Sequence, residues 1–460
     1  MTVNDDNKNT PQAPETNIFE GETLKKLANK KISRRSLLAK SAAAGIGATA
    51  FGSLLAACGP TSSSSNGPVT ITFWALVDTT GEQANEINTF NSLHSGKINV
   101  VLQTLPPVAT DQYSKYITAL QGGNSTPDVV QIDVTWPAPF ATPGWLAPID
   151  SYVNSSYLSQ FWPSAASVGK VNGKLYGIQR YMDIGMFYYR TDLVKKYGGN
   201  VPATRSDMMT MAQAIMKGEA ANGIEYGYLM PGKKIEAIVD EWLEFTWGDG
   251  GNIGTPGNLQ VSGSTQVAAL QFMYDLIYTY KLAPQGTNTY APNDILALFQ
   301  AGKAPFMRNW TYAYALANDP TKSKVAGNVG VAPTLATTGN QGHGCTGGWV
   351  LGINANSKNK DAAWTFIDYM LSKSTQTSMA MNAGLIPSRP DVISDPNVLA
   401  KAPFLSQINS ILTSGNNRPT LVNYNQFTTP MQAAINGVLS GQGSASSALS
   451  GVQSQVGSLT

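Results

Sequence analysis

Tryptophan, tyrosine and charged residues gather at the ends of several predicted strands. Four groups stand out: Asp133 with Trp136, Tyr181 with Asp183, Arg308 with Trp310, and the run Gly347-Gly348-Trp349. Carboxylates and arginine pair with adjacent hydroxyl groups, and flat aromatic rings pack against the apolar face of a sugar. Each aromatic residue taken singly is more often part of a core. Because ligands of open α/β sheets bind beyond the carboxyl ends of strands, the grouping favours a sugar-binding cleft.

Residue patterns typical of enzymes are missing from the sequence. The two histidines, His94 and His343, have no partner at metal-ligand spacing, and no G-x-S-x-G turn occurs. The run 227–234 (GYLMPGKK) approaches a phosphate-binding loop but ends in Lys234, where a hydroxyl residue would hold Mg²⁺. A carboxylate pair for glycoside cleavage stays open, because its spacing is spatial. We expect a binding protein rather than an enzyme, with no metal and no cofactor.

Residues 1–57 have the pattern of an export signal. Arg34 and Arg35 precede a weakly apolar stretch rich in Ala and Gly, which ends in small residues before Cys58. The arginine pair is typical of the twin-arginine route. A membrane-spanning helix is the alternative, but Lys40 and several glycines interrupt the stretch, and such a helix needs about 20 continuous apolar residues.

The run 55–58 (LAAC) resembles a bacterial lipobox, in which the cysteine is acylated and becomes the new N-terminus. Residues 58–68 would then be the lipidated Cys58 and a Ser-rich tether. Acyl chains contribute about 0.8 kcal/mol per buried CH₂, so they would anchor the protein to the outer face of the cell membrane. An ordinary cleaved signal with a chance cysteine is the alternative. Cys345, the other cysteine, is expected to be a packed core residue.

The charge balance gives no reason to expect nucleic acid or a polyanionic substrate. Residues 1–57 hold eight of the 31 basic and five of the 29 acidic residues, which leaves 23 and 24 in the mature chain. No apolar run after residue 57 is long enough to cross a bilayer. A mature chain of roughly 400 residues exceeds one ordinary core, so two domains are expected. A monomer is the simplest expectation for the oligomeric state.

Apolar runs rich in β-branched residues alternate with helical segments. Strands are expected at 69–74, 97–102, 127–133, 304–308, 328–331 and 348–353. Helices are expected at 81–94, 295–299 and 361–371, with Ala362 and Phe366 inward in the last, and around Val267, Leu270, Tyr274 and Ile277. This alternation predicts parallel α/β units. The tail keeps Leu449, Val452, Val456 and Leu459 in register, so we expect it to pack on the protein.

The strand-end motifs resemble those of the extracellular solute-binding proteins of ABC sugar importers (family 1), and trehalose/maltose-binding lipoproteins in particular. The matching blocks are 127–137 (PDVVQIDVTWP), 144–150 (GWLAPID), 175–190 (LYGIQRYMDIGMFYYR), 302–310 (GKAPFMRNW), 347–353 (GGWVLGI), 357–364 (SKNKDAAW) and 384–389 (GLIPSR). They run in family order from about Val69 to the C-terminus. The resemblance therefore covers essentially the whole mature chain.

The resemblance implies an α/β fold of the type II periplasmic-binding-protein class, with two lobes joined by a hinge that the chain crosses three times. Lobe one would comprise 69–177 and 345–384, and lobe two 180–344 and 389–460. The crossings would lie near Ile178, Cys345 and Leu385. This arrangement would place the aromatic and charged motifs at the cleft between the lobes.

The same resemblance implies which residues line the sugar cleft. The matching positions are Asp133, Tyr181, Asp183, Trp310, Gly348, Trp349 and Arg389. The implied roles are hydroxyl pairing for Asp133, Asp183 and Arg389, and ring packing for Tyr181, Trp310 and Trp349. Glu82 follows the first strand, where the family supplies a further polar contact, although the run 77–81 departs from the family pattern. Trp136 and Trp247 are expected as wall residues, with core packing as the equal alternative.

The function implied by the resemblance is that of a binding lipoprotein of an ABC carbohydrate importer. It would capture trehalose, maltose or a short oligosaccharide by hinge closure and deliver it to a permease. The ATPase would be a separate chain, because this sequence has no intact Walker motif. Three alternatives remain: a secreted glycan-acting enzyme, the same fold binding a phosphorylated polyol, a peptide or a metal chelate, and a sensory or adhesive lipoprotein.

Overall fold

The computed structural model describes residues 67–460. The predicted signal peptide at 1–57, the predicted lipidation residue Cys58 and residues 59–66 of the predicted tether lie outside the described residues. None of the helices in the described part combines the length and the apolar character needed to cross a bilayer.

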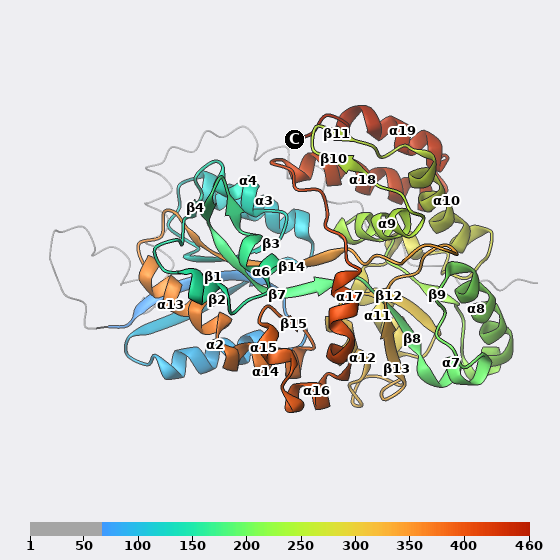
Figure 1. Ribbon diagram of the computed structural model, residues 1–460, viewed down its shortest axis with the longest axis horizontal. Helices are drawn as coiled ribbons and strands as arrows, with labels where there is room; N and C mark the ends of the chain where they lie inside the picture. Colours follow the sequence, from blue (N-terminus) through green and yellow to red (C-terminus); the bar gives the residue numbers. More distant parts are fainter. Residues whose placement is uncertain (1–66) are drawn as a thin grey trace, which may run out of the picture. The chain divides into compact units, whose positions relative to one another are not determined.

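The larger of the two main sheets has seven strands in the order β15-β7-β14-β3-β1-β2, with β4 paired to β14 (Figure 1). The strands are β1 (Val69–Leu76), β2 (Ile98–Leu105), β3 (Val129–Asp133), β4 (Leu146–Ala147), β7 (Gly177–Ile184), β14 (Thr346–Asn354) and β15 (Ile386–Pro387). β1 is parallel to β2 and β3, whereas β14 is antiparallel to β3 and β7. The predicted parallel units are thus confirmed on one side of the sheet, and a returning antiparallel strand completes it.

Both faces of the larger sheet are covered, and every residue of β3 is buried, including the polar Gln131 and Asp133. Phe73 packs edge-on against Phe366 on one face, and Trp74 packs against Tyr116 on the other. The surrounding helices are α2 (Glu82–Leu93), α3 (Ala109–Gln121), α4 (Pro137–Ala141), α5 (Ser155–Leu158), α6 (Pro163–Ser167), α13 (Lys360–Leu371) and α14 (Lys373–Ala383). In α13, Ala363 rather than Ala362 is buried beside Phe366.

The smaller main sheet has the order β13-β8-β12-β9. Its strands are β8 (Met186–Arg190), β9 (Tyr228–Leu229), β12 (Phe306–Asn309) and β13 (Val329–Ala332). The associated helices are α7 (Thr191–Tyr197), α8 (Arg205–Glu219), α9 (Glu236–Gly248), α10 (Ser264–Tyr278), α11 (Pro292–Gln300), α12 (Tyr312–Ala317), α15 (Pro390–Ile393), α16 (Pro396–Lys401), α17 (Ile408–Thr413), α18 (Tyr424–Leu439) and α19 (Ala445–Val456). Short connecting elements are the hairpins β5 (Lys170–Val171) with β6 (Lys174–Leu175) and β10 (Gly254–Thr255) with β11 (Asn258–Leu259), and the 3₁₀ helices η1 (Ala220–Asn222), η2 (Thr287–Thr289) and η3 (Pro403–Gln407).

The C-terminal tail packs on the protein as predicted. Leu449, Val452 and Val456 of α19 are buried in the same core as α10 and α18. Cys345 is also buried in this core, which confirms its prediction as a packed residue. Each predicted strand and helix has a counterpart in the structure, with boundaries that differ by a few residues.

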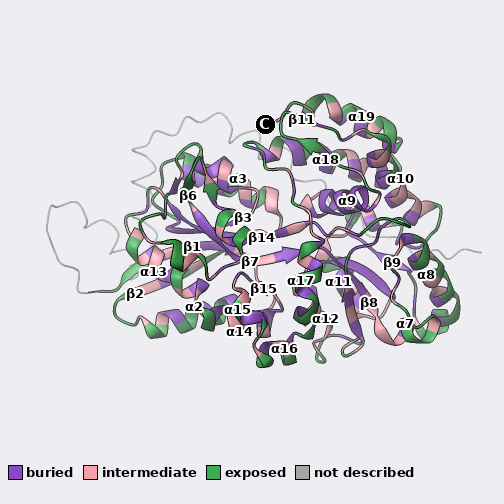
Figure 2. Cartoon of the chain, viewed as in Figure 1, coloured by how far each residue is buried: buried purple, intermediate pink, exposed green. Residues whose placement is uncertain are grey.

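Helix α9 is unusual because it is buried along nearly its whole length (Figure 2). Its sequence EAIVDEWLEFTWG is apolar apart from four carboxylates, Glu236, Asp240, Glu241 and Glu244, and a threonine. Residues four apart lie on one face of a helix, so Glu236, Asp240 and Glu244 form one row. Buried carboxylates require partners, and that row supplies much of the site described below.

The chain passes between the two sheets where a strand of one leads directly into a strand of the other. β7 stays in the larger sheet as far as Ile184 and β8 begins the smaller sheet at Met186, so the first passage lies at Gly185 and not near Ile178. β14 returns to the larger sheet directly after Cys345, and β15 is the last strand paired there. The exact lobe boundaries given above stay a prediction.

Candidate ligand-binding site

A cavity of about 440 Å³ lies where the ends of β3, β7 and β14 face residues that follow β12. Seven of the ten predicted binding residues line it: Glu82, Asp133, Tyr181, Asp183, Trp310, Gly348 and Trp349. This volume falls in the range of small-molecule sites, roughly 300–1,000 Å³.

Three of the lining residues lie side by side in the larger sheet. Trp349 of β14 is in register with Asp133 of β3 and with Tyr181 of β7. The indole of Trp349 packs edge-on against Trp136, with ring centroids 6.0 Å apart. Gly348 has φ of 120°, and an added Cβ would collide with the Tyr181 carbonyl, so only glycine fits there. The sheet therefore presents a carboxylate and two aromatic rings in a row.

Asp183 and Trp310 form the opposite part of the wall. Asp183 Oδ1 accepts hydrogen bonds from the Thr311 backbone N–H at 3.0 Å, the Thr311 hydroxyl at 2.7 Å and the Ile184 N–H at 2.9 Å. Its Oδ2 has no hydrogen-bond partner among residues 67–460, and the residue lines the cavity. Burial raises the pKa of Asp183 to about 6, although the Thr311 donors favour its charged form.

The ring of Trp310 is held between a cation and a glycine. The guanidinium of Arg308 lies 4.3 Å from its ring centroid. On another side the ring approaches Gly347, where an added Cβ would be 3.1 Å from the indole. The two glycines before Trp349 thus have separate roles, because Gly347 makes room for the ring of Trp310 and Gly348 adopts a positive φ within β14.

The end of the cavity beside α2 is polar, and most of its charges are already paired. Glu82 accepts hydrogen bonds from the Ser378 hydroxyl and from Asn382 Nδ2. Arg180 pairs with Glu86 and also donates to two glutamine side chains. Burial raises the pKa of Glu86 to about 7, against the attraction of Arg180.

Arg418 lines the cavity and was missed by the sequence analysis. Its Nη2 donates to both oxygens of Asp133, at 2.9 and 3.0 Å, and its side chain is only 4% exposed. Glu236 and Asp240 of α9 flank the same guanidinium. The carboxylates of α9, spaced by four in an apolar helix, were the signal that a buried cation had to lie nearby.

Three predicted binding residues do not line the cavity, which corrects the expectation for each. Arg389 pairs with Asp391 two residues later and lies over the ring of Phe161. Trp136 is buried behind Trp349, so it supports the wall without forming it. Trp247 is buried in the core near the end of α9. For both tryptophans, core packing was the stated alternative.

The chain matches a protein-family model over residues 66–377, and the family is described as bacterial extracellular solute-binding protein. This chain belongs to that family. The resemblance to extracellular solute-binding proteins of ABC transporters and the two-lobe α/β fold that it implies are confirmed, and the molecule is a solute-binding protein rather than an enzyme.

Similar proteins cover most of this solute-binding protein. A probable ABC transporter-binding protein of Deinococcus radiodurans is 32% identical, over 78% of this chain and 86% of its own length. The mannitol-binding protein of Pseudomonas aeruginosa is 27% identical, over 66% of this chain and 70% of its own length. Among solved structures, maltose-bound MalE3 of T. maritima is 32% identical with a TM-score of 0.80, over 84% of this chain and 99% of that one.

We expect substitutions of Asp183 and Arg389 to have different effects on the affinity of the solute-binding protein for its ligand. Asp183→Asn should weaken ligand binding about tenfold or more, because a hydrogen bond to a charged acceptor is worth ~1.5–3 kcal/mol. Arg389→Ala should leave the dissociation constant unchanged within about twofold, since its partner Asp391 is outside the cavity. Isothermal titration calorimetry on both variants checks this, and a large loss in Arg389→Ala would restore its predicted role.

The buried carboxylates of the solute-binding protein make its stability depend on pH. Burial raises the pKa of Asp240 to about 8 and that of Glu241 to about 8, from ordinary values of 3.8 and 4.5. Between about pH 4.5 and 8 these two carboxyl groups bind more protons in the folded protein than in the unfolded chain. The free energy of unfolding should therefore fall as the pH rises from about 4.5 to 8. Denaturant unfolding at pH 5, 6.5 and 8 measures this slope. Asp240→Asn should make the slope shallower without abolishing it, because Glu241 keeps its raised pKa, and an equal slope in that variant would contradict the assignment.

Proposed function

We propose that this solute-binding protein captures a sugar, most simply a disaccharide such as maltose or trehalose or a short oligosaccharide, and delivers it to an ABC permease. The observation that carries the proposal is the cavity wall, where Trp310 and Trp349 accompany Asp133 and Asp183. Flat rings match the apolar faces of pyranose rings, and carboxylates accept hydrogen bonds from hydroxyl groups. The T. maritima protein with the same fold was solved with maltose.

The charges of the cavity argue against an anionic solute such as a phosphorylated polyol. Seven carboxylates line the cavity against three basic residues, of which Arg180 is paired with Glu86 and Arg418 with Asp133 and Glu236. The third, Lys233, is exposed and has no ion pair within residues 67–460. A phosphate group would need a cation free to pair with it, so these guanidiniums are poorly suited to that role. A neutral polyhydroxylated ligand fits this balance better. An uncharged polyol stays a second candidate, because one relative is named a mannitol-binding protein.

A thermal-shift screen of the purified mature protein tests the ligand class. The panel would contain maltose, trehalose, a maltotriose-length oligosaccharide, mannitol and a sugar phosphate. A ligand present at about 100 times its dissociation constant stabilises the folded state by roughly 2.7 kcal/mol, which raises the melting temperature visibly. A shift with an α-glucoside supports the proposal, a shift with mannitol alone moves it to polyols, and no shift with any sugar overturns it.

We also propose that the two lobes close on the ligand about the hinge, that a permease with a separate ATPase receives the closed form, and that the protein acts as a monomer. The lobes would be 69–177 with 345–384 and 180–344 with 389–460, the first passage adjusted to Gly185. The binding set would be Glu82, Asp133, Tyr181, Asp183, Trp310, Gly348 and Trp349. Co-purification with the permease in the presence of sugar, and its loss without sugar, checks delivery.

Export by the twin-arginine route and anchoring through acylated Cys58 complete the proposal. Both rest on the sequence pattern of residues 1–58. Cell fractionation tests them together with two variants. Cys58→Ser should move the protein from the membrane fraction to the medium or periplasm, and replacement of both Arg34 and Arg35 by lysine should keep it in the cytoplasm.

A further inference from the structure

The Asp133–Arg418 ion pair joins two parts of the protein that otherwise face each other across the cavity. Asp133 ends β3 of the larger sheet, whereas Arg418 lies between α17 and α18. Leu421 and Tyr424, just beyond Arg418, are buried in the same core as Phe187 of the smaller sheet. The side chain of Arg418 therefore starts on one lobe, and the two hydrogen bonds from its Nη2 end on Asp133 of the other.

Arg418 is held from its own side by the carboxylates of α9. Its Nη1 donates to Glu236 Oε1 at 3.2 Å, and its Nε lies 3.8 Å from Asp240 Oδ1. Glu236 is fixed in turn by the hydroxyls of Tyr424 and Thr428. With α9 in place, Arg418 is oriented before it meets Asp133, so little further conformational entropy is lost when the pair forms.

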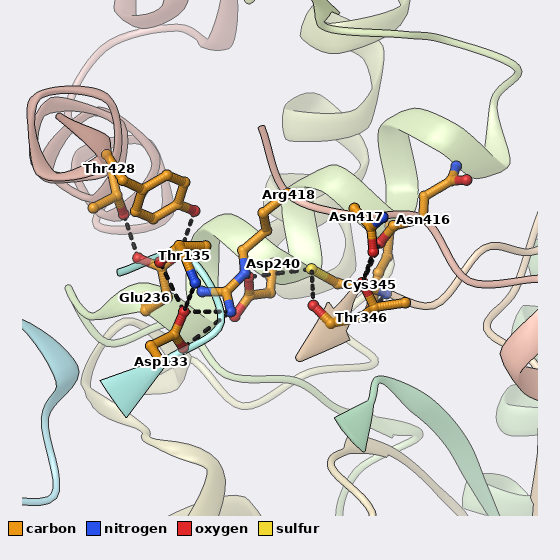
Figure 3. Close-up of polar contacts among 12 residues, drawn as sticks. Asp133, Thr135, Glu236, Asp240, Cys345, Thr346, Asn416, Asn417, Arg418 and Thr428 are labelled. Atoms are coloured by element: carbon orange, nitrogen blue, oxygen red, sulfur yellow. Dashed lines mark hydrogen bonds and ion pairs between the residues drawn. The ribbon is translucent and has the colours of Figure 1, made fainter. Parts of the chain in front are cut away.

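The same network continues to the hinge (Figure 3). The Cys345 thiol donates to Asp240 Oδ1 at 3.3 Å, and the Cys345 N–H donates to Glu244 Oε1 at 2.9 Å. The Cys345 carbonyl accepts from the N–H of Gly185, at the first passage between the sheets, at 3.0 Å. Asn416, two residues before Arg418, bonds through its backbone to Gly344 and to Thr346. The hinge peptides and the segment that carries Arg418 are thus bonded into one unit.

We propose that Asp133 and Arg418 form a latch that stabilises the closed arrangement of the lobes before any ligand binds, and that Glu236 and Asp240 are positioning residues for it. Nη2 of Arg418 contacts both oxygens of Asp133 while Nη1 and Nε stay with Glu236 and Asp240, so the pair forms only in one closed arrangement. Its net strength is moderate, because opening lets water solvate both charges. The latch thus shifts the open–closed equilibrium without locking it. The ligand then binds a fraction of molecules that are already closed, and its apparent affinity rises with that fraction.

The inference rests on the lobe closure proposed above, but its test needs no ligand. Spin labels at Asn88→Cys on α2 and Gln213→Cys on α8, both exposed positions, report the distance between the lobes by pulsed electron paramagnetic resonance. Cys345 is buried and would escape labelling. A Cys58→Ser background removes the other thiol.

The unliganded parent should show a population at the short distance expected from the structure. Asp133→Asn and Arg418→Gln should each lower the ratio of closed to open molecules about tenfold or more, and the double variant should lower it no further. Asp240→Asn should give a smaller decrease, and Arg389→Gln, whose ion pair lies outside the cavity, should give none. Thermal unfolding verifies that each variant is folded.

Two results would overturn the latch. One is a parent that occupies only the open distance without ligand, and the other is closed populations unchanged by Asp133→Asn and Arg418→Gln. Failure of every sugar in the thermal-shift screen would leave these distance measurements untouched. The latch and the ligand assignment can therefore fail separately.

Discussion

Replacing Arg308 with methionine should lower the free energy of unfolding by about 3–5 kcal/mol, the cost of breaking a buried ion pair from one side. The Arg308 side chain is 1% exposed and donates to both oxygens of Glu244, at 2.9 and 2.5 Å. Its Nε also lies 3.3 Å from Glu241. Without the guanidinium, two carboxylates of α9 would stay buried next to each other with no cation between them. Equilibrium denaturation in urea measures the loss.

The matched control is Arg190→Met. Arg190 makes an ion pair of similar geometry with Asp192, but the side chains are 15% and 38% exposed. Exposed pairs contribute at most about 1 kcal/mol, so this variant should unfold near the parent midpoint. If Arg308→Met does not fold, Arg308→Lys keeps the charge but loses the two-bond geometry, and it should be destabilised to a smaller extent. Equal stability of Arg308→Met and Arg190→Met would contradict the role assigned to α9.

Replacing Trp310 with alanine should weaken sugar binding by about 30-fold, or ~2 kcal/mol, with little loss of stability. The indole is only partly buried, lines the cavity and is fixed by Arg308 at 4.3 Å, so its ring can pack flat against a sugar without further ordering. Isothermal titration calorimetry measures the change, with the ligand that gives the largest thermal shift.

Trp364→Ala is the control for this experiment. Trp364 also stacks on an aromatic ring, that of Tyr152 with centroids 5.2 Å apart, but it lies on α13 and does not line the cavity. Its removal should leave affinity unchanged. Equal affinity of Trp310→Ala and the parent would remove Trp310 from the binding set and weaken the case for a sugar.

The sequence predicted the repeating elements well because their patterns are local. The apolar run of β1, the helix stopped at Gly302, which has φ of 75°, and the buried face of α10 were all confirmed. The aromatic and acidic residues at strand ends were found for the same reason, since strand ends can be located from the run that precedes them. The order of strands in the larger sheet came from the structure alone, because pairing over long separations leaves no local pattern.

The errors at the site have a different cause. Asp133 and Arg418 are 285 residues apart, and the segment around Arg418 has no helical or strand periodicity. Arg389 fitted a family motif, but its guanidinium pairs with Asp391 and does not line the cavity. Trp136 and Trp247 fitted the pattern of cavity-lining residues, but both are buried in the core. The sequence of α9 contained a signal for Arg418, because carboxylates within an apolar helix are buried and require cations as partners.

The position of β14 in the larger sheet determines when that sheet can be completed. β14 is paired on one edge with β3 and on the other with β7, yet it begins only at Thr346. A nascent chain or proteolytic fragment that ends earlier leaves β3 and β7 with bare inner edges, which invite pairing with other chains. The first half of the sequence is therefore not a separable module. Truncation libraries should yield soluble protein only when residues 346–354 are included, and completion of the larger sheet during synthesis must wait until that strand has emerged.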